Sequence, residues 1–398
     1  MAHPTIKIDT NVQATKRALS EDNDEGFDVL DGPDQDDPGL EAGDTESVPP
    51  FLCQSVLEIH QKFEELEWIQ RTRLAEGMLA NDPSHRWALE ADPEVKARNR
   101  YVNVQAWANS RIHLRVNDGE CDFINASPIT LKDSVSQEER RYIATQTFES
   151  GREKCSQYFP LNSDNPLVLL REDERDPFVN NENHPTGDGS VVGAVALLET
   201  TFDEKSRSEI RKLRLTLGAE SKIVWHFLFA GWADYSKPEG DDRSALLHLI
   251  EQSGSKSTPD NPRIVHCSAG VGRTGTFIAL DHLLLELQSD QLLQVTDPEV
   301  DPVFETVNQM REQRMMMVYN EMQLQFIYEV LREQTDRKLG KVPEITGRRS
   351  DERSSKMAKL STESEYLPSS KPELEPVSDR TFTPTRSWSG TPEVSDNE

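Results

Sequence analysis

The sequence lacks most features of secreted and membrane proteins. It has four cysteines in 398 residues, too widely scattered for a disulfide framework or a zinc site. No apolar run reaches the roughly 18 residues that a membrane helix needs, and the opening residues lack the apolar stretch of a signal peptide. We therefore expect a soluble protein of a reducing compartment, cytoplasmic with the nucleus as an alternative, and no membrane partner.

Basic charge is also scarce. The chain has 71 acidic and 44 Lys and Arg residues, which gives a formal net charge of -27. A surface that binds nucleic acid or anionic lipid neutralises phosphates with an excess of basic side chains. We therefore expect no nucleic-acid partner.

The chain divides into one folded domain and two tails. Residues 1–48 are acidic and interspersed with Gly and Pro, and residues 337–398 are rich in Ser, Thr and Pro. Such segments cannot bury enough apolar surface to offset the entropy lost on ordering. We predict two disordered tails and a folded domain over residues 51–336.

Within that domain, the apolar pattern changes from mixed to helical along the chain. A helical spacing over 55–68 predicts an opening helix, and the segments 193–201, 210–217 and 223–229 read as neighbouring strands. After residue 273 the apolar spacing is helical almost to the end of the domain. This order indicates an α/β or α+β fold, with a sheet flanked by helices.

The segment RIVHCSAGVGRTG at 263–275 combines a short apolar run, a loop of small residues and the start of a helix. Cys267 lies at the junction, where the helix dipole and unpaired backbone N–H groups favour its thiolate. The loop backbone can converge on one anion, Arg273 can bind two of its oxygens, and Thr274 can donate its hydroxyl to the sulfur. The alternative is that Cys267 is a buried structural thiol beside a glycine turn. The predicted anion-binding loop consists of Ser268, Ala269, Gly270, Val271 and Gly272.

The motif HCSAGVGRTG resembles the signature of the cysteine-dependent protein tyrosine phosphatases. KARNRYVNV at 96–104, SRIHL at 110–114 and DFINAS at 122–127 resemble consecutive landmarks of the phosphotyrosine-specific group, and the Met-rich segment near 315 is similar to fungal, non-receptor members. The resemblance implies a central twisted mixed sheet flanked by helices, a catalytic domain at 51–336, and neither metal nor cofactor.

The resemblance also implies roles for single residues. Tyr101 would stack on the substrate ring, and Asn103 would hold the substrate backbone. Asp234, in GWADY, would be the general acid and later the base for water. Gln323 would assist that water. Supporting roles would fall to His266, before the nucleophile, and to Glu149 and Lys154, which would brace Arg273 and Asp234.

The chain departs from the family pattern at three places. Ala233 replaces the proline of the acid loop, which should alter loop closure. Tyr319 stands where the first of two glutamines is normal, which puts the hydrolytic step in question. After Gln146 the sequence passes directly to a later family segment, so that one helix and one strand, about 30 residues, are missing. We interpret this gap as a splice form or a gene-model omission.

Together, these patterns predict a monomeric phosphotyrosine-protein phosphatase that works through a phosphocysteine. A tyrosine-phosphorylated protein would be its partner, with a mitogen-activated protein kinase as one candidate. Two alternatives remain open at this point. The chain could bind phosphotyrosine without turnover, or it could act only as a scaffold if the missing strand leaves the domain partly unfolded.

Overall fold

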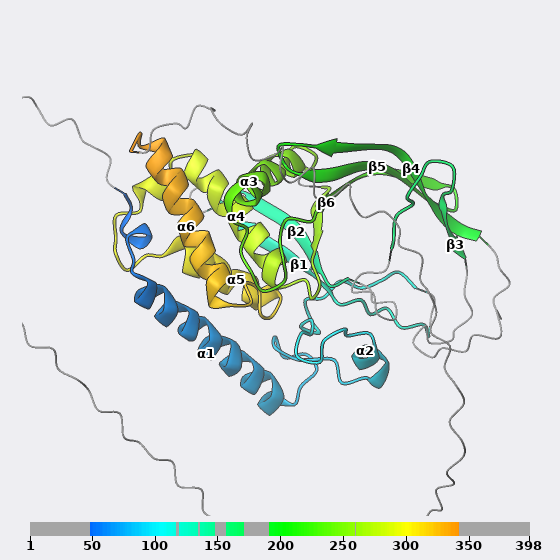
Figure 1. Ribbon diagram of the computed structural model, residues 1–398. Helices are drawn as coiled ribbons and strands as arrows, with labels where there is room; N and C mark the ends of the chain where they lie inside the picture. Colours follow the sequence, from blue (N-terminus) through cyan, green and yellow to red (C-terminus); the bar gives the residue numbers. More distant parts are fainter. Residues whose placement is uncertain are drawn as a thin grey trace, which may run out of the picture.

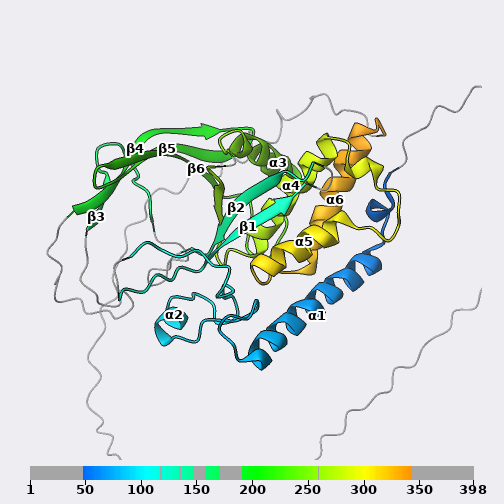
Figure 2. The same cartoon turned by 180° about the vertical axis from the view of Figure 1, so that it is seen from behind.

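The computed structural model describes residues 48–341, except 117–118, 134–135, 148–156, 171–190 and 259. Figures 1 and 2 show α1, α4, α5 and α6 at one end of the molecule, β3, β4 and β5 at the other, and β1 and β2 between them. The predicted tails lie almost wholly outside the described residues, so their disorder stays a prediction. The elements are, in order, η1 Pro50–Leu52, α1 Val56–Ala80, α2 Pro93–Ala97, β1 Ala126–Lys132, β2 Glu139–Thr145, β3 Leu167–Leu170, β4 Val191–Asp203, β5 Ser208–Leu217, β6 Glu220–Phe229, α3 Gly240–Gly254, β7 Arg263–His266, α4 Gly272–Gln288, η2 Leu292–Gln294, α5 Pro302–Gln313 and α6 Glu321–Lys338.

The helices form one hydrophobic core around α4. Most of α4 is buried, α3, α5 and α6 pack against it, and α1 packs against α5 and α6. Three of the long helices, α1, α5 and α6, begin at side-chain caps, which satisfy backbone N–H groups of the first turn. Ser55 forms a capping box with Glu58, Asp301 caps α5, and Asn320 caps α6. None of the described helices combines the length and the apolar character needed to cross a membrane.

The first sheet has the strand order β1-β2-β7. β1 and β2 are antiparallel, whereas β2 and β7 are parallel, with Thr145 opposite His266. Because parallel strands end at the same edge, the residues that follow β2 lie beside those that follow β7. This register places residues 145–147 against the loop after Cys267.

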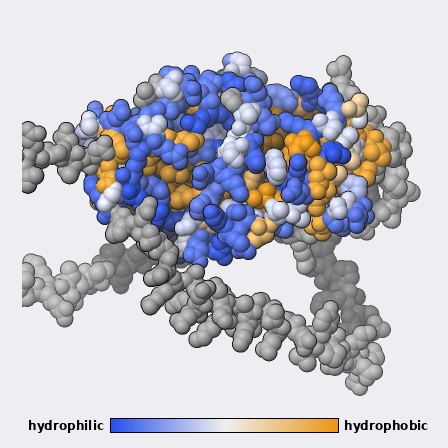
Figure 3. Space-filling model, turned by 90° about the horizontal axis from the view of Figure 1, so that it is seen from above, coloured by the Kyte–Doolittle hydropathy of each residue, from blue (hydrophilic) through white to orange (hydrophobic). Residues whose placement is uncertain are grey.

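The second sheet is antiparallel, with the order β3-β4-β5-β6. One face buries Val195, Leu197 and Leu213, packed against Phe159 and Leu167. Other apolar side chains of this sheet are exposed, and Figure 3 shows apolar side chains at the surface of this end of the molecule. The exposed set includes Val191, Phe202, Leu215, Leu217, Ile223, Trp225 and Leu228.

The expected single sheet is therefore divided in two. Within the described residues, no strand pairs with the second edge of β7, and Ile264 on that strand is 66% exposed. A strand buried inside a sheet normally has both edges paired. The α/β fold class expected from the sequence is confirmed. The loss of one helix and one strand between Gln146 and Thr147 stays a prediction, because residues 148–156 and 171–190 lie outside the described residues.

Candidate active site

A single pocket collects residues from four separate parts of the sequence. It lies where β7 ends and α4 begins, with Cys267 between the two elements. The pocket brings together most of the residues that the sequence singles out, and it adds Val104 and Tyr235, which sequence reasoning missed. Its lining consists of Tyr101, Asn103, Val104, Asp234, Tyr235, Cys267, Ser268, Ala269, Val271, Gly272, Arg273, Tyr319 and Gln323.

The loop from 268 to 272 has its carbonyl groups bound on the side away from the pocket. The Ser268 carbonyl accepts from the Thr147 N–H (3.2 Å), and the Val271 carbonyl accepts from the Val318 N–H (3.1 Å). In a trans peptide, C=O and N–H point in opposite directions, so the N–H groups that follow these carbonyls face the pocket. α4 has no side-chain cap and no acidic residue in its first turn. This arrangement leaves the first N–H groups of α4 available for an anion, and the anion cradle stays a prediction.

Gly270 is required by the path of this loop. Its φ is +70°, in the region that favours glycine, and an added Cβ would lie 2.2 Å from the Thr145 carbonyl oxygen. The close approach follows from the parallel pairing of β2 with β7. Gly270 itself does not line the pocket.

Arg314 supports the loop from behind and was missed by sequence reasoning. It is fully buried, and its guanidinium donates to the carbonyls of Gly270 (2.9 Å) and Ala269 (3.0 Å) and to Asn125 Oδ1 (2.7 Å). Burial lowers the pKa of Arg314 to about 10, against a raising effect of the nearby Cys267, so the group stays charged at neutral pH. A buried cation behind the cradle favours an anion in front of it. The sequence indication of Arg314 as a functional residue was its position three residues after Arg311.

Arg273 lines the pocket and contacts the segment that carries Asp234. Its Nη1 donates to the Trp232 carbonyl (2.8 Å), and its Nη2 forms an ion pair with Asp234. The predicted general acid and the predicted phosphate ligand are thus in direct contact. A phosphoryl group that entered the pocket would compete with the Asp234 carboxylate for the guanidinium.

Tyr101 forms the wall of the pocket from the α2–β1 segment. Its hydroxyl lies 2.8 Å from Ser268 Oγ, and the guanidinium of Arg100 lies 5.2 Å from its ring centre. These contacts place the ring at the cradle. Asn103 lines the same side.

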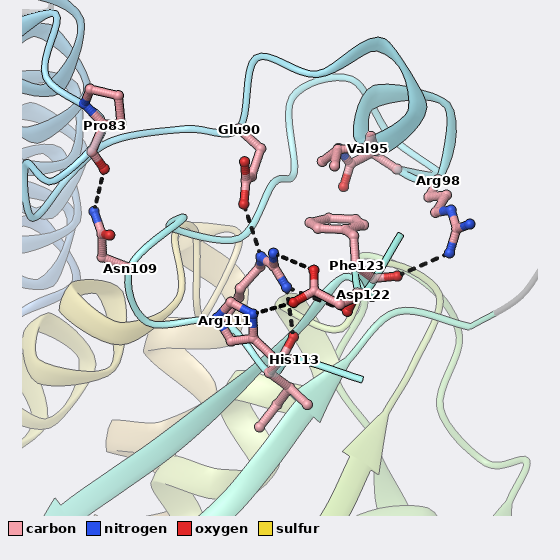
Figure 4. A network of polar contacts seen from close by, with 11 residues as sticks. Pro83, Glu90, Val95, Arg98, Asn109, Arg111, His113, Asp122 and Phe123 are labelled. Atoms are coloured by element: carbon pink, nitrogen blue, oxygen red, sulfur yellow. Dashed lines mark hydrogen bonds and ion pairs between the residues drawn. The ribbon is translucent and has the colours of Figure 1, made fainter. Parts of the chain in front are cut away.

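A network of polar contacts braces the segment that carries Tyr101 (Figure 4). The Arg111 side chain is 6% exposed and donates to Glu90 Oε1 (3.0 Å) and Asp122 Oδ1 (2.7 Å). His113 Nδ1 lies 2.6 Å from the other oxygen of Asp122. Because these residues come from both ends of the segment, they limit its movement relative to the sheet.

His266 belongs to a chain of hydrogen bonds behind the nucleophile. Arg211 donates to His226 Nδ1 (3.4 Å). The hydroxyl oxygen of Tyr158 lies 2.9 Å from His226 Nε2 and 2.5 Å from His266 Nε2. An arginine can only donate, so neutral His226 carries its proton on Nε2, and the tyrosine hydroxyl donates to His266. Burial lowers the pKa of His226 to about 4 and also lowers the pKa of His266. His266 is therefore neutral at pH 7.

The remaining predicted residues lie around or below the pocket. Thr274 is buried, and its Oγ1 has no hydrogen-bond partner in the described part of the chain. Gln323 lines the pocket, and its Oε1 accepts from the Tyr319 N–H (3.0 Å). Glu149 and Lys154 fall outside the described residues, so the expected braces of Arg273 and Asp234 stay predictions. Over the described ranges, no group of three or more His, Cys, Asp or Glu residues is arranged to hold a metal ion.

The comparison structures share the fold. The catalytic domain of human protein tyrosine phosphatase non-receptor type 18 aligns with a TM-score of 0.53 at 22% identity, over 73% of this chain and 100% of that domain. A complex of the same phosphatase with HER2 phosphopeptides also has a TM-score of 0.53 and 22% identity, over 70% of this chain and 93% of that one. At this identity the likeness concerns the fold alone.

The sequence relatives include two fungal proteins. Tyrosine-protein phosphatase 2 of Schizosaccharomyces pombe is 31% identical over 323 residues, which cover 71% of this chain and 41% of that protein. Tyrosine-protein phosphatase 1 of Saccharomyces cerevisiae is 31% identical over 328 residues, which cover 71% of this chain and 96% of that protein. The chain thus spans less than half of the first relative and nearly all of the second.

A family match covers most of the described domain. The family described as protein-tyrosine phosphatase matches residues 95–148 and 147–333. The match is broken where the sequence suggested a missing helix and strand. The resemblance stated from the signature loop is confirmed, and the chain belongs to the protein-tyrosine phosphatase family.

Proposed function

We propose that this chain hydrolyses phosphotyrosine in proteins through a phosphocysteine intermediate. The observation that carries the proposal is the convergence of Cys267, Arg273 and Asp234 on one pocket at the start of α4. A thiolate at a helix N-terminus is a nucleophile, and the surrounding N–H groups stabilise the charge that develops on the phosphoryl oxygens. The family membership and the pocket wall formed by Tyr101 favour an aromatic phosphate ester over phosphoserine.

In the first step, the Cys267 sulfur would form a bond to phosphorus while the bond to the tyrosine oxygen breaks. Asp234 would give its proton to that oxygen, so that neutral tyrosine leaves. Arg273 and the N–H groups of residues 268–272 would hold the three phosphoryl oxygens. Thr274 would stabilise the sulfur when it later leaves.

In the second step, water would attack the phosphocysteine and regenerate the thiolate. Asp234 would accept a proton from the water, and Gln323 would orient it. Gln323 supports this role by its position in the pocket, beside residues 267–273. The phosphate would leave with the oxygen of the water.

The proposed substrate is a tyrosine-phosphorylated protein in intracellular signalling. A related phosphatase fold has been solved with HER2 phosphopeptides, which supports a phosphotyrosine peptide as the ligand class. A mitogen-activated protein kinase remains the more specific proposal, from the Met-rich segment that resembles fungal members. We further propose a monomer that acts in the cytoplasm, with the nucleus as a second compartment.

Steady-state hydrolysis of p-nitrophenyl phosphate tests the proposal. Cys267→Ser should abolish turnover and retain binding of a phosphotyrosine peptide, because the cradle and Arg273 are unchanged. Cys53→Ser is the matched control, since Cys53 is exposed and lies outside the pocket. Activity that survives in Cys267→Ser would refute the proposed nucleophile.

Binding without turnover is the second candidate function. It is favoured by Tyr319, which lines the pocket beside Gln323, where a glutamine of the family would position water. Rapid mixing with p-nitrophenyl phosphate separates the two functions. A burst that ends at one equivalent of nitrophenol indicates a stalled phosphocysteine, whereas continued release indicates the enzyme.

A further inference from the structure

The acid loop, residues 231–237, is fixed at its tryptophan by contacts within the loop and with Arg273. Trp232 Nε1 donates to the Ser236 carbonyl (2.8 Å), Ser236 Oγ donates to the Ala233 carbonyl (2.8 Å), and Arg273 binds the Trp232 carbonyl. The Trp232 ring is buried and lies edge-on to Phe326, with ring centres 6.1 Å apart. These contacts hold the tryptophan, but they do not reach the residue after Asp234.

That residue, Tyr235, has a conformation that needs support from outside the loop. Its φ is +61°, an unfavourable region for a residue with a side chain, and it is 63% exposed. Strained residues persist where neighbouring groups hold them. The residues that contact Tyr235 therefore stabilise its strained conformation.

Two consecutive residues before α6 supply this support. The rings of Tyr235 and Tyr319 lie with their centres 5.6 Å apart, at an interplanar angle of 59°. Asn320 Nδ2 donates to the Tyr235 carbonyl (3.0 Å). The same side chain caps α6, because its Oδ1 accepts from the Gln323 N–H (2.9 Å). One amide thus joins the acid loop to the first turn of the helix.

The replacement at Ala233 makes this external support more important. A proline fixes φ and so limits the conformations of a loop, whereas an alanine does not. An aromatic contact like that of Tyr235 and Tyr319 shifts an equilibrium by about 2- to 10-fold. The two departures in the sequence, at positions 233 and 319, thus act in opposite directions on the same loop.

We propose that Tyr319, with Asn320, is a positioning residue that holds Tyr235 and thereby keeps Asp234 beside the oxygen of the leaving group. This inference rests on the proposed function and assigns Tyr319 to the first chemical step. A role for Tyr319 in placing water would instead belong to the second step. The two steps are measured by different kinetic constants.

The leaving group of the substrate separates these roles. kcat/KM reports the formation of the phosphocysteine, which depends on Asp234 when the leaving oxygen is strongly basic. General acid catalysis contributes about 10²- to 10⁴-fold to such steps. Cleavage of phenyl phosphate needs the proton from Asp234 far more than cleavage of p-nitrophenyl phosphate does, because the p-nitrophenolate that leaves is stable without a proton.

The experiment compares kcat/KM for the two esters in four variants. Tyr319→Ala should lower kcat/KM for phenyl phosphate by about 5-fold and leave that for p-nitrophenyl phosphate within about 2-fold. Tyr235→Ala should have the same effect, and the double variant should be no worse than either single variant, because both remove one contact. Tyr319→Phe keeps the ring and should keep the leaving-group pattern of the wild type.

Asn320→Asp provides a second, independent variant. The carboxylate can still cap α6, but it cannot donate to the Tyr235 carbonyl, so the loss should again be larger for phenyl phosphate. This variant keeps the inference testable if Tyr319→Ala fails to fold. Trp68→Ala, which truncates an aromatic side chain that is 65% exposed on α1, is the control and should change neither ester.

Three results would overturn the inference while leaving the proposed function intact. They are an equal loss of kcat/KM for both esters in Tyr319→Ala, an unchanged kcat/KM with a lowered kcat, and additive losses in the double variant. Wild-type protein that hydrolyses neither ester, or Cys267→Ser that still hydrolyses them, would instead overturn the proposed function, and the positioning role with it.

Discussion

Replacement of Arg314 by methionine tests whether the anion cradle depends on a buried cation. Methionine has a similar length but no donor, so four buried acceptors lose their partner: the carbonyls of Ala269 and Gly270, Asn125 Oδ1 and Ser127 Oγ. An unsatisfied buried polar group costs about 1–3 kcal/mol. Because the replacement also removes the cost of burying a charge, we expect a net loss of about 3 kcal/mol in the free energy of unfolding.

Urea denaturation at pH 7 measures this loss, and vanadate titration measures the effect on the cradle. Arg314→Met should bind the oxyanion more weakly than the wild type, because the positive charge behind the loop is gone. Arg314→Lys is the matched variant. Its ammonium group keeps the charge but reaches fewer of the four acceptors, so it should lose less stability and less affinity than Arg314→Met.

An Arg314→Met variant that keeps its unfolding free energy within about 1 kcal/mol of the wild type and its affinity for vanadate would refute this role of the buried cation. Such a result would mean that water replaces the guanidinium without loss. A loss of stability at unchanged affinity would show that the cradle does not depend on the charge.

Two other perturbations follow from the same structure. Gly270→Ala should reduce kcat/KM by about 100-fold, because its Cβ would meet the Thr145 carbonyl and displace the cradle. Gly218→Ala is the control, since that glycine also has a positive φ but no atom within 4 Å of the added Cβ. An equal loss of kcat/KM in both variants would contradict the steric explanation. Burial lowers the pKa of His282 to about 4 in the folded protein. Below pH 6.5 the unfolded chain therefore binds a proton at this residue more readily than the folded protein does. For this reason the free energy of unfolding should fall by about 2 kcal/mol between pH 8 and pH 5. His282→Gln should flatten that part of the pH dependence in urea melts, and a slope identical to the wild type would show that His282 does not cause it.

The sequence predicted those elements whose apolar spacing is regular. The helices after residue 273 and the strands β4, β5 and β6 follow one period each, so their pattern alone indicates them. The opening helix was predicted over 55–68 but continues to Ala80. Its second half buries a polar surface that includes Arg73, which bonds Asn308 and Glu312 on α5. No apolar period can indicate such packing.

The same limit applies to the site. Cys267, Arg273 and the loop between them are contiguous, so local chemistry was enough to single them out. Arg314 acts through backbone carbonyls of a segment that lies far away in the sequence, and Tyr235 acts through its contact with Tyr319. The first contact depends on how the chain after α5 packs behind residues 269–270, and the second on how the loop before α6 packs against the acid loop. A resemblance names the residues of a motif, but such contacts appear only in the folded chain.

Among the described residues nothing pairs with the second edge of β7, and such an edge affects how a protein behaves at high concentration. Its backbone groups and the 66% exposed Ile264 offer a template on which another extended chain can add. The nucleophile follows directly after this strand, so self-association through the edge would reach the catalytic loop. A form of the protein with about 30 more residues between Gln146 and Thr147, enough for one helix and one strand, would cover the edge. We expect that form to self-associate less than the present chain at equal concentration.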